Sequence, residues 1–286
     1  MKQIEEYHWK RSESAVLYGK LYIPDGTLKV LVIVVHGIGE HSGCYDDWAE
    51  KFVSQSVGVL TSDLRGHGRS SGRRGHASVE TIKDDLRFMI GIMQEKFPNT
   101  PVVLFGHSMG GHIVLSYAVG GDVKVQGIIA SSPWLKLVSP PSPVLVRLAK
   151  WTSPVMPWLT VRTGIKSGQL VRDGAGVKSS KTDPLLHKKI SVKLFSDLWT
   201  NSETILRSKR LVKIPLLLMH GDDDPLTSCQ ASEFFARNAG RYVTFRKWRG
   251  MRHHLLNETG NEMVFKYVMK WLSEKMIQTW NSSEPS

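Results

Sequence analysis

The chain has 286 residues, a hydrophobic fraction of 41%, a charged fraction of 22% and a formal net charge of +12. These values are typical of a globular protein with a substantial core, and the longest unbroken apolar run, residues 30–35, is far shorter than the roughly 20 residues of a membrane span. The basic residues are spread out, without a helix-turn-helix, zinc-ligand or stacked-aromatic pattern, so no nucleic-acid partner is expected.

Two further features bear on the compartment. The N-terminal stretch MKQIEEYHWKRSES has neither the apolar centre nor the cleavage site of a secretory signal. The two cysteines, Cys44 and Cys229, are too few and too far apart for a disulfide framework. We therefore expect a cytoplasmic protein, whose positive charge would also favour peripheral contact with anionic lipid surfaces.

The chain begins with two extended segments, ending at YIPDG, that predict an antiparallel hairpin on the edge of a sheet. Short runs rich in Val, Ile, Leu and Phe then recur, and most are followed by glycine or a polar turn, as buried parallel strands are. These predicted strands are residues 29–37, 57–63, 101–108, 125–132, 214–222 and 241–248.

Helical patterns lie between the predicted strands. Apolar residues recur at spacings of three and four within residues 78–97, and again near the C-terminus at Val264, Val268 and Leu272. Repeated strand-helix-strand units predict an α/β fold with a doubly wound, mostly parallel sheet.

This alternation stops between residues 136 and 210. The segment opens with SPPSP, holds six prolines up to Pro184 and carries its apolar residues in short helical groups, with no strand-like run. We interpret residues 136–210 as a helical cap inserted into a core made of residues 1–135 and 211–286. The cap is expected over the carboxyl edge of the sheet, where open α/β sheets bind ligands.

The sequence GHSMGG, residues 106–111, contains Gly-x-Ser-x-Gly between a predicted strand and a predicted helix. That context predicts a nucleophile elbow, in which Ser108 occupies a tight turn that the flanking glycines permit. The backbone N–H of the next residue, Met109, is then one expected oxyanion donor.

A serine nucleophile needs a histidine base and an acid, which in this kind of fold follow it in the order Ser, Asp, His. The strand at 214–222 is followed by carboxylates at Asp222, Asp223 and Asp224, of which Asp224 is preferred because the other two lie nearer the turn. The base is expected just after the last strand, where His253 and His254 stand side by side.

Taken together, these motifs resemble the monoacylglycerol lipase and lysophospholipase group of α/β-hydrolases over residues 10 to 275. The motifs that carry the resemblance are HGIGEHSG (36–43), SDLRGHGRSSG (62–72), GHSMGG (106–111), and HGDDDPL (220–226) with GMRHHLLNE (250–258). One position departs from the pattern, because Cys44 stands where members of the group often carry an arginine.

The resemblance implies specific roles for site residues. Asp224 takes the place of the acid in His-Gly-x-x-Asp, and His253 that of the base in Gly-x-x-His. The loop after the third strand would give the second oxyanion donor, the N–H of Ile38. The side chains expected to contact substrate are Glu40, His41, Cys44, His107 and His254.

The implied activity is cofactor-free and metal-free hydrolysis of a glycerol monoester to a fatty acid and glycerol, with peripheral membrane or micelle contact through the cap. Two neighbouring activities stay open, a lysophospholipase and a carboxylesterase for short or aromatic acid esters. A peptidase of the iminopeptidase type is disfavoured by HGIGEH, which lacks that group's Gly-Gly-Pro pattern. A catalytically silent binding protein of the same fold would require a broken triad, whereas Ser108, Asp224 and His253 are all present.

Overall fold

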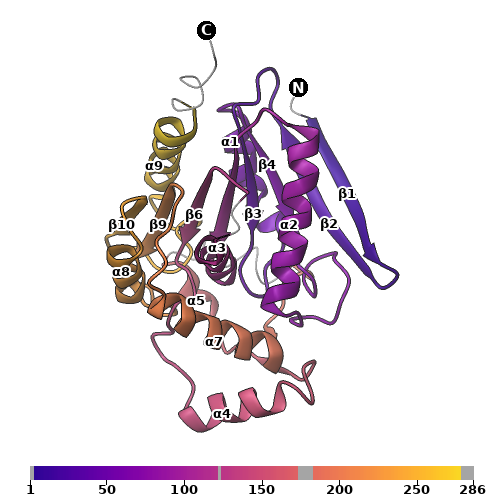
Figure 1. The fold of residues 1–286 in the computed structure, drawn as a ribbon, viewed down its shortest axis with the longest axis vertical. Coiled ribbons are helices and arrows are strands. Elements are labelled where there is room, and N and C mark those ends of the chain that lie inside the picture. Colours follow the sequence, from indigo (N-terminus) through magenta and orange to yellow (C-terminus); the bar gives the residue numbers. More distant parts are fainter. Residues whose placement is uncertain (1–2, 122–123, 173–182, 278–286) are drawn as a thin grey trace.

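The computed structural model describes residues 3–121, 124–172 and 183–277 and is built around an eight-stranded sheet with the order β1-β2-β4-β3-β5-β6-β9-β10 (Figure 1). Its strands are β1 (Gln3–Ser12), β2 (Ala15–Ile23), β3 (Val30–Val35), β4 (Val57–Ser62), β5 (Val102–His107), β6 (Gly127–Ser131), β9 (Leu216–Gly221) and β10 (Val243–Trp248). Neighbours from β4 to β10 run parallel, while β1 and β2 form an antiparallel hairpin on one edge. The predicted strands and edge hairpin are confirmed.

Helices cover both faces of this sheet (Figure 1). One face carries α2 (Val79–Lys96), α3 (Met109–Gly120), α7 (Val192–Arg207) and α8 (Cys229–Asn238), and the other carries α1 (Asp46–Val53) and α9 (Asn261–Leu272). Successive strand residues such as Ile33 and Val34 are both buried but face opposite sides, because side chains alternate along a strand. A central strand covered on both faces is therefore apolar throughout, which is the pattern seen in the sequence.

The segment between β6 and β9 holds α4 (Pro143–Thr152), β7 (Thr160–Arg162), α5 (Ser167–Leu170), β8 (Lys189–Ser191) and α7. The sequence predicted no strand here, but β7 and β8 pair antiparallel. Three-residue strands are too short to produce a readable alternation, which explains the difference. In Figure 1, α4 lies at the end of the molecule away from both marked termini, and α7 lies between α4 and the sheet.

Helix α4 begins where its sequence dictates and exposes most of its apolar side chains. Ser142 accepts a hydrogen bond from the Leu145 backbone N–H and Pro143 fills the first helical position, a favourable start. The Trp151 side chain is 74% exposed, and of the helix's residues only Val146 is buried. Within the described ranges, no helix is both long enough and apolar enough to cross a bilayer.

Candidate active site

Ser108 occupies a strained turn between β5 and α3. Its φ is 55° and its ψ is −112°, a conformation that non-glycine residues rarely adopt. The turn is also crowded, since a Cβ on Gly106 would lie 2.3 Å from the Gly110 carbonyl oxygen, and one on Gly110 would lie 1.9 Å from the Val35 carbonyl oxygen. The glycines of the motif thus let the backbone close tightly around Ser108, as its sequence context predicted.

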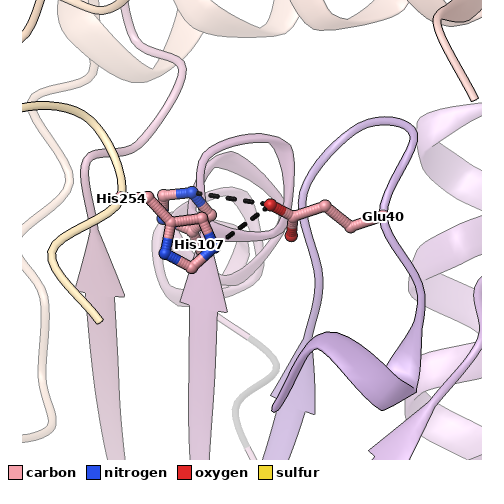
Figure 2. A group of neighbouring side chains, drawn as sticks. All are labelled: Glu40, His107 and His254. Carbon is pink, nitrogen blue, oxygen red and sulfur yellow. Dashed lines mark ion pairs between the residues drawn. The ribbon is translucent and has the colours of Figure 1, made fainter. Parts of the chain in front are cut away.

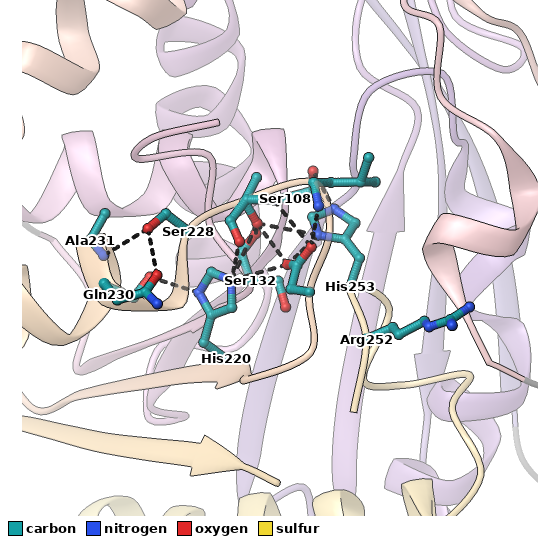
Figure 3. A network of polar contacts seen from close by, with 12 residues as sticks. Ser108, Ser132, His220, Ser228, Gln230, Ala231, Arg252 and His253 are labelled. Atoms are coloured by element: carbon teal, nitrogen blue, oxygen red, sulfur yellow. Dashed lines mark hydrogen bonds and ion pairs between the residues drawn. The ribbon is translucent and has the colours of Figure 1, made fainter. Parts of the chain in front are cut away.

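The structure brings the three predicted triad residues into hydrogen-bond contact, and Figure 3 labels two of them, Ser108 and His253. The Nε2 atom of His253 lies 2.9 Å from the Ser108 Oγ atom, and its Nδ1 atom lies 2.7 Å from Asp224 Oδ2. The other two carboxylates point elsewhere, Asp222 to the Gly250 backbone N–H and Asp223 to the Arg172 guanidinium. An imidazole placed in this way can accept the serine proton through one nitrogen while the carboxylate fixes its tautomer through the other.

Asp224 is held by more than the histidine. Its Oδ1 atom accepts the backbone N–H groups of Leu226 and Thr227, and its Oδ2 atom contacts the Thr227 hydroxyl at 2.8 Å and His220 Nε2 at 3.0 Å. Burial raises the pKa of Asp224, but the charge and hydrogen bonds of His253 and His220 outweigh burial and hold that pKa below its ordinary value. The carboxylate is therefore ionised at neutral pH.

His220 and Thr227 were given no role by the sequence. His220 also contacts the Ser232 hydroxyl at 2.8 Å, so its ring is held between α8 and Asp224. The sequence did contain a signal for them, because both residues lie within four positions of Asp224 and His220 is the first residue of the HGDDDPL motif. Sequence spacing does not tell which way such side chains point, however.

The loop that carries His253 is tied to residues 168–172, which we call the clamp segment. The backbone N–H of His254 donates to the Leu170 carbonyl at 2.8 Å, and the Arg172 backbone N–H donates to the Glu258 carboxylate at 3.1 Å. Arg252 points away from the triad in Figure 3, and its guanidinium reaches the Gly168 carbonyl at 2.5 Å. The base thus rests on a loop that the segment between β6 and β9 supports.

The predicted oxyanion donors lie in suitable backbone settings. Met109 is the first residue of α3, so its N–H is at a helix N-terminus, where negative charge is stabilised. Ile38 is in a tight turn closed by the Glu40 N–H and the Gly37 carbonyl, and the Glu40 side chain in turn accepts the Gly37 N–H at 2.8 Å. Gly39 has a φ of 77°, and a Cβ there would lie 2.0 Å from the His187 carbonyl oxygen.

The other predicted contact residues separate into two groups. Glu40 and His107 line a cavity beside Ser108, and His254 Nε2 lies 3.2 Å from Glu40 Oε1. His41 instead contacts the Asp183 carboxylate at 2.7 Å, and Cys44 packs against the core, where burial raises the pKa of its thiol. Neither His41 nor Cys44 is among the residues that line the two cavities at Ser108.

Two cavities meet at Ser108 and share Ile38, Ser108, Thr163, Ile165 and His253. One, of about 310 Å³, is mostly apolar, and its walls include Trp134, Leu137, Val161, Ile190, Phe195 and Leu226. The other, of about 380 Å³, is also lined mostly by apolar surface but adds the side chains of Glu40, His107, His187 and Lys188, and we call it the polar cavity. The site therefore offers different surroundings on the two sides of the serine hydroxyl.

Comparisons with known proteins show which family and which relatives this chain is similar to. The family described as "Serine aminopeptidase, S33" matches residues 26–260. An uncharacterised abhydrolase domain-containing protein of Dictyostelium discoideum is 32% identical over 89% of this chain, which spans only 27% of that protein. The monoacylglycerol lipase of Mycolicibacterium smegmatis is 30% identical, covering 88% of this chain and 91% of its own. The crystal structure of Paleococcus ferrophilus monoacylglycerol lipase is 31% identical, has a TM-score of 0.84, and covers 91% of this chain and 99% of its own.

Proposed function

The chain belongs to the serine aminopeptidase S33 family of serine hydrolases, and from this premise we propose that it hydrolyses carboxylic esters of single-chain lipids, above all monoacylglycerols. The architecture is the α/β-hydrolase fold, as predicted. The observation that carries the proposal is a Ser-His-Asp constellation at the meeting point of one apolar and one polar cavity. The relatives named monoacylglycerol lipase support it.

In this proposal, the Ser108 hydroxyl attacks the ester carbonyl while His253 Nε2, 2.9 Å away, takes its proton. Asp224 holds the ring and stabilises the imidazolium. The N–H groups of Ile38 and Met109 stabilise the oxyanion. His253 then protonates the leaving alcohol, and a water molecule, deprotonated by His253, releases the fatty acid from Ser108.

The two cavities suggest how the substrate is oriented. The acyl chain lies in the apolar cavity, where each buried methylene contributes about 0.8 kcal/mol. The alcohol lies in the polar cavity, where Glu40 and His107 can contact its free hydroxyl groups. A di- or triacylglycerol would have to place a second acyl chain among these polar groups, so a single-chain ester is preferred.

We assign residues 136–210 the role of a cap that contacts lipid surfaces peripherally. The support is an exposed apolar group on and after α4: Val144, Leu145, Leu148, Trp151, Val155 and Trp158. Exposed apolar patches of this kind on a water-facing surface mark interaction sites. The net charge of +12 would add attraction to anionic lipid.

The nucleophile is tested by comparing two buried serines. Ser108→Ala should lower kcat by roughly a millionfold, the cost of removing a triad serine, and should abolish labelling by a fluorophosphonate. Ser131→Ala is the matched control, because Ser131 is also buried and lies beside His107 in the sheet, and this variant should label normally. If Ser108→Ala kept a tenth of the wild-type turnover, the mechanism would be wrong.

The substrate class is tested by kcat/KM for glycerol monoesters of increasing acyl length. Burial of 0.8 kcal/mol per methylene predicts an increase of up to about fourfold per added carbon until the apolar cavity is filled. Acetyl and aromatic acid esters and a prolyl amide serve as comparison substrates. Hydrolysis of these without hydrolysis of long-chain monoacylglycerol would disprove the lipase assignment while leaving the serine mechanism intact.

A lysophospholipid is the second candidate substrate. Lys188 lines the polar cavity and could contact a phosphate there. The same kinetic series should therefore include a lysophosphatidylcholine with the acyl chain of the best monoacylglycerol. If Lys188→Met lowers kcat/KM for the lysophospholipid and spares the monoacylglycerol, the phosphate contact is supported.

A further inference from the structure

Three potential metal ligands from separate segments meet beside Ser108 (Figure 2). Glu40 follows β3, His107 ends β5, and His254 lies in the loop after β10. Glu40 Oε1 is 3.2 Å from His254 Nε2 and 4.0 Å from His107 Nε2, and one ligand atom from each residue lies within 4.8 Å of the others. No clustered ligand set is visible in the sequence, because only folding brings these residues together.

The histidines of this group have unused nitrogen atoms. Among the described residues, neither ring nitrogen of His107 has a hydrogen-bond partner, although the side chain is fully buried, and His254 Nδ1 has none either. A buried polar atom without a partner is costly, so its presence calls for an explanation. In Figure 2, the His107 and His254 rings lie next to one another and both approach the Glu40 carboxylate.

The protonation states also suit metal binding. Burial holds the pKa of His107 well below its ordinary value, so its ring is neutral at pH 7. Burial raises the pKa of Glu40, but its contacts with His254, His107 and Tyr45 together lower that pKa by more, so the side chain is a carboxylate. Neutral imidazole and ionised carboxylate are the forms that bind metal ions.

We propose that Glu40, His107 and His254 bind a divalent transition-metal ion, Zn²⁺ in particular, at a site beside the candidate triad. Two histidines and one glutamate are an established zinc ligand set that leaves one coordination position open. Bonds of about 2.0–2.2 Å to a tetrahedral ion place ligand atoms roughly 3.4 Å apart. The 3.2 Å pair of Glu40 and His254 already fits this spacing, and His107, whose Nε2 lies 4.0 Å from Glu40 Oε1, must move closer to both. Two of the three ligands, Glu40 and His107, also line the polar cavity at Ser108.

An ion at this site should inhibit hydrolysis, a consequence that rests on the proposed function. The His107 and His253 ring centroids are only 4.9 Å apart, so the ion would oppose formation of a cationic His253 imidazolium. The ion would also bind one oxygen of the Glu40 carboxylate. The other oxygen accepts hydrogen bonds from the Gly37 N–H and the Tyr45 hydroxyl. We therefore expect zinc to inhibit ester hydrolysis reversibly and a chelator to relieve that inhibition.

Binding is tested without any activity, by calorimetric titration of Ser108→Ala protein with zinc chloride. One zinc ion per chain should bind. Mg²⁺ and Ca²⁺ should not bind, because they require oxygen ligands. Adding the His254→Gln substitution should weaken zinc binding at least tenfold. His8→Gln, which changes an exposed histidine on β1, is the control and should leave it unchanged. The proposal is overturned by absence of stoichiometric binding, or by zinc affinity that depends on His253→Gln and not on His254→Gln.

Inhibition is tested by the rate at which a fluorophosphonate labels wild-type protein. Saturating zinc should slow labelling at least tenfold, chelation should restore it, and in His254→Gln protein the zinc concentration that halves the rate should rise at least tenfold. Stoichiometric zinc binding with an unchanged labelling rate would overturn the inhibitory role. Zinc binding by a protein that hydrolyses no ester would instead contradict the proposed function and leave the metal site standing.

Discussion

His253 and His254 are neighbours in the chain, yet their rings have different partners. His253 joins Ser108 to Asp224, whereas His254 Nε2 lies 3.2 Å from Glu40 Oε1 and its ring lies tilted against that of His107. His253→Ala should therefore abolish turnover, by roughly a millionfold in kcat, while His254→Ala should change it only modestly. Steady-state kinetics of the two purified variants, with circular dichroism to verify folding, makes the comparison. If His254→Ala abolished turnover and His253→Ala changed it only modestly, the base would be His254.

The three successive aspartates provide a second comparison at the residue scale. Asp224→Asn should lower kcat by roughly 10⁴, because an amide supports the wrong imidazole tautomer. Asp223→Asn removes only a half-exposed ion pair with Arg172, which contributes less than about 1 kcal/mol, so its kcat should stay near wild type. Steady-state kinetics of both variants tests this expectation. If Asp223→Asn lowered kcat and Asp224→Asn did not, Asp223 would be the acid of the triad.

The candidate triad could be found from the sequence because its motifs are local. Ser108 is placed by a strand, a turn and a helix that are contiguous in the chain, and the resemblance to a known family selected Asp224 and His253. His220 could not be assigned, because its contact with Asp224 depends on how β9 and α8 pack. The group of Glu40, His107 and His254 was also not predicted as a cluster, since its members come from three segments that only the sheet aligns.

At the scale of elements, the clamp segment links the region between β6 and β9 to the loop of His253. Glu258 is the centre of this link, because its buried carboxylate accepts the backbone N–H groups of both Arg172 and Arg252. Glu258→Gln would place an amide N–H₂ group against these donors. A lost hydrogen bond to a charged group costs roughly 1.5–3 kcal/mol, enough to loosen the loop.

We therefore expect Glu258→Gln to lower both the melting temperature and kcat, the latter about tenfold, because the base is less well positioned. The control is Glu262→Gln on α9, which changes an exposed glutamate paired with Lys51 and should affect neither. Thermal unfolding and steady-state kinetics measure the two effects. Wild-type kcat in a destabilised Glu258→Gln protein would show that the clamp segment serves stability alone.

The sequence predicts the elements of the core better than those of residues 136–210. Core strands such as β3 and β5 are six residues long and buried on both faces, so their composition is distinctive. Strands β7 and β8 have three residues each, and their pairing depends on contacts outside the strands, such as that of the Ser191 N–H with the Gly75 carbonyl. Short elements held by distant partners leave little local signal.

At the scale of the whole molecule, buried neutral histidines make stability depend on pH. Burial lowers the pKa of His36, His67, His107 and His112, in the case of His112 to about 4. Below the ordinary value of 6.5 the unfolded chain binds protons that the folded chain does not, so the stability contributed by these groups is present above pH 6.5 and lost as pH falls from 6.5 toward the lowered values.

His112, whose pKa is lowered to about 4, should cost roughly 1 kcal/mol of unfolding free energy between pH 7.5 and pH 5.5, and the other three histidines should act in the same direction. Urea unfolding at both pH values should therefore show a loss of at least about 1 kcal/mol in the wild-type protein. His112→Gln should reduce that loss by about 1 kcal/mol, whereas His8→Gln should not. An unfolding free energy that is the same at pH 7.5 and pH 5.5 would contradict the prediction.

The adjacency of β6 and β9 has a consequence for how such a protein can change. Residues 136–210 leave the sheet after β6 and return before β9, yet these strands are direct neighbours, with Ser131 opposite Met219 and the Ser132 N–H donating to the Met219 carbonyl. The two strands run parallel, so the chain leaves the sheet at the carboxyl end of β6 and re-enters at the amino end of β9, with α7 packed on the sheet along the way. The register is set by the pairing of β6 with β9 and not by the length of the chain between β6 and α7. An engineer could therefore exchange the part between β6 and α7, so that substrate range changes while the reaction chemistry is kept.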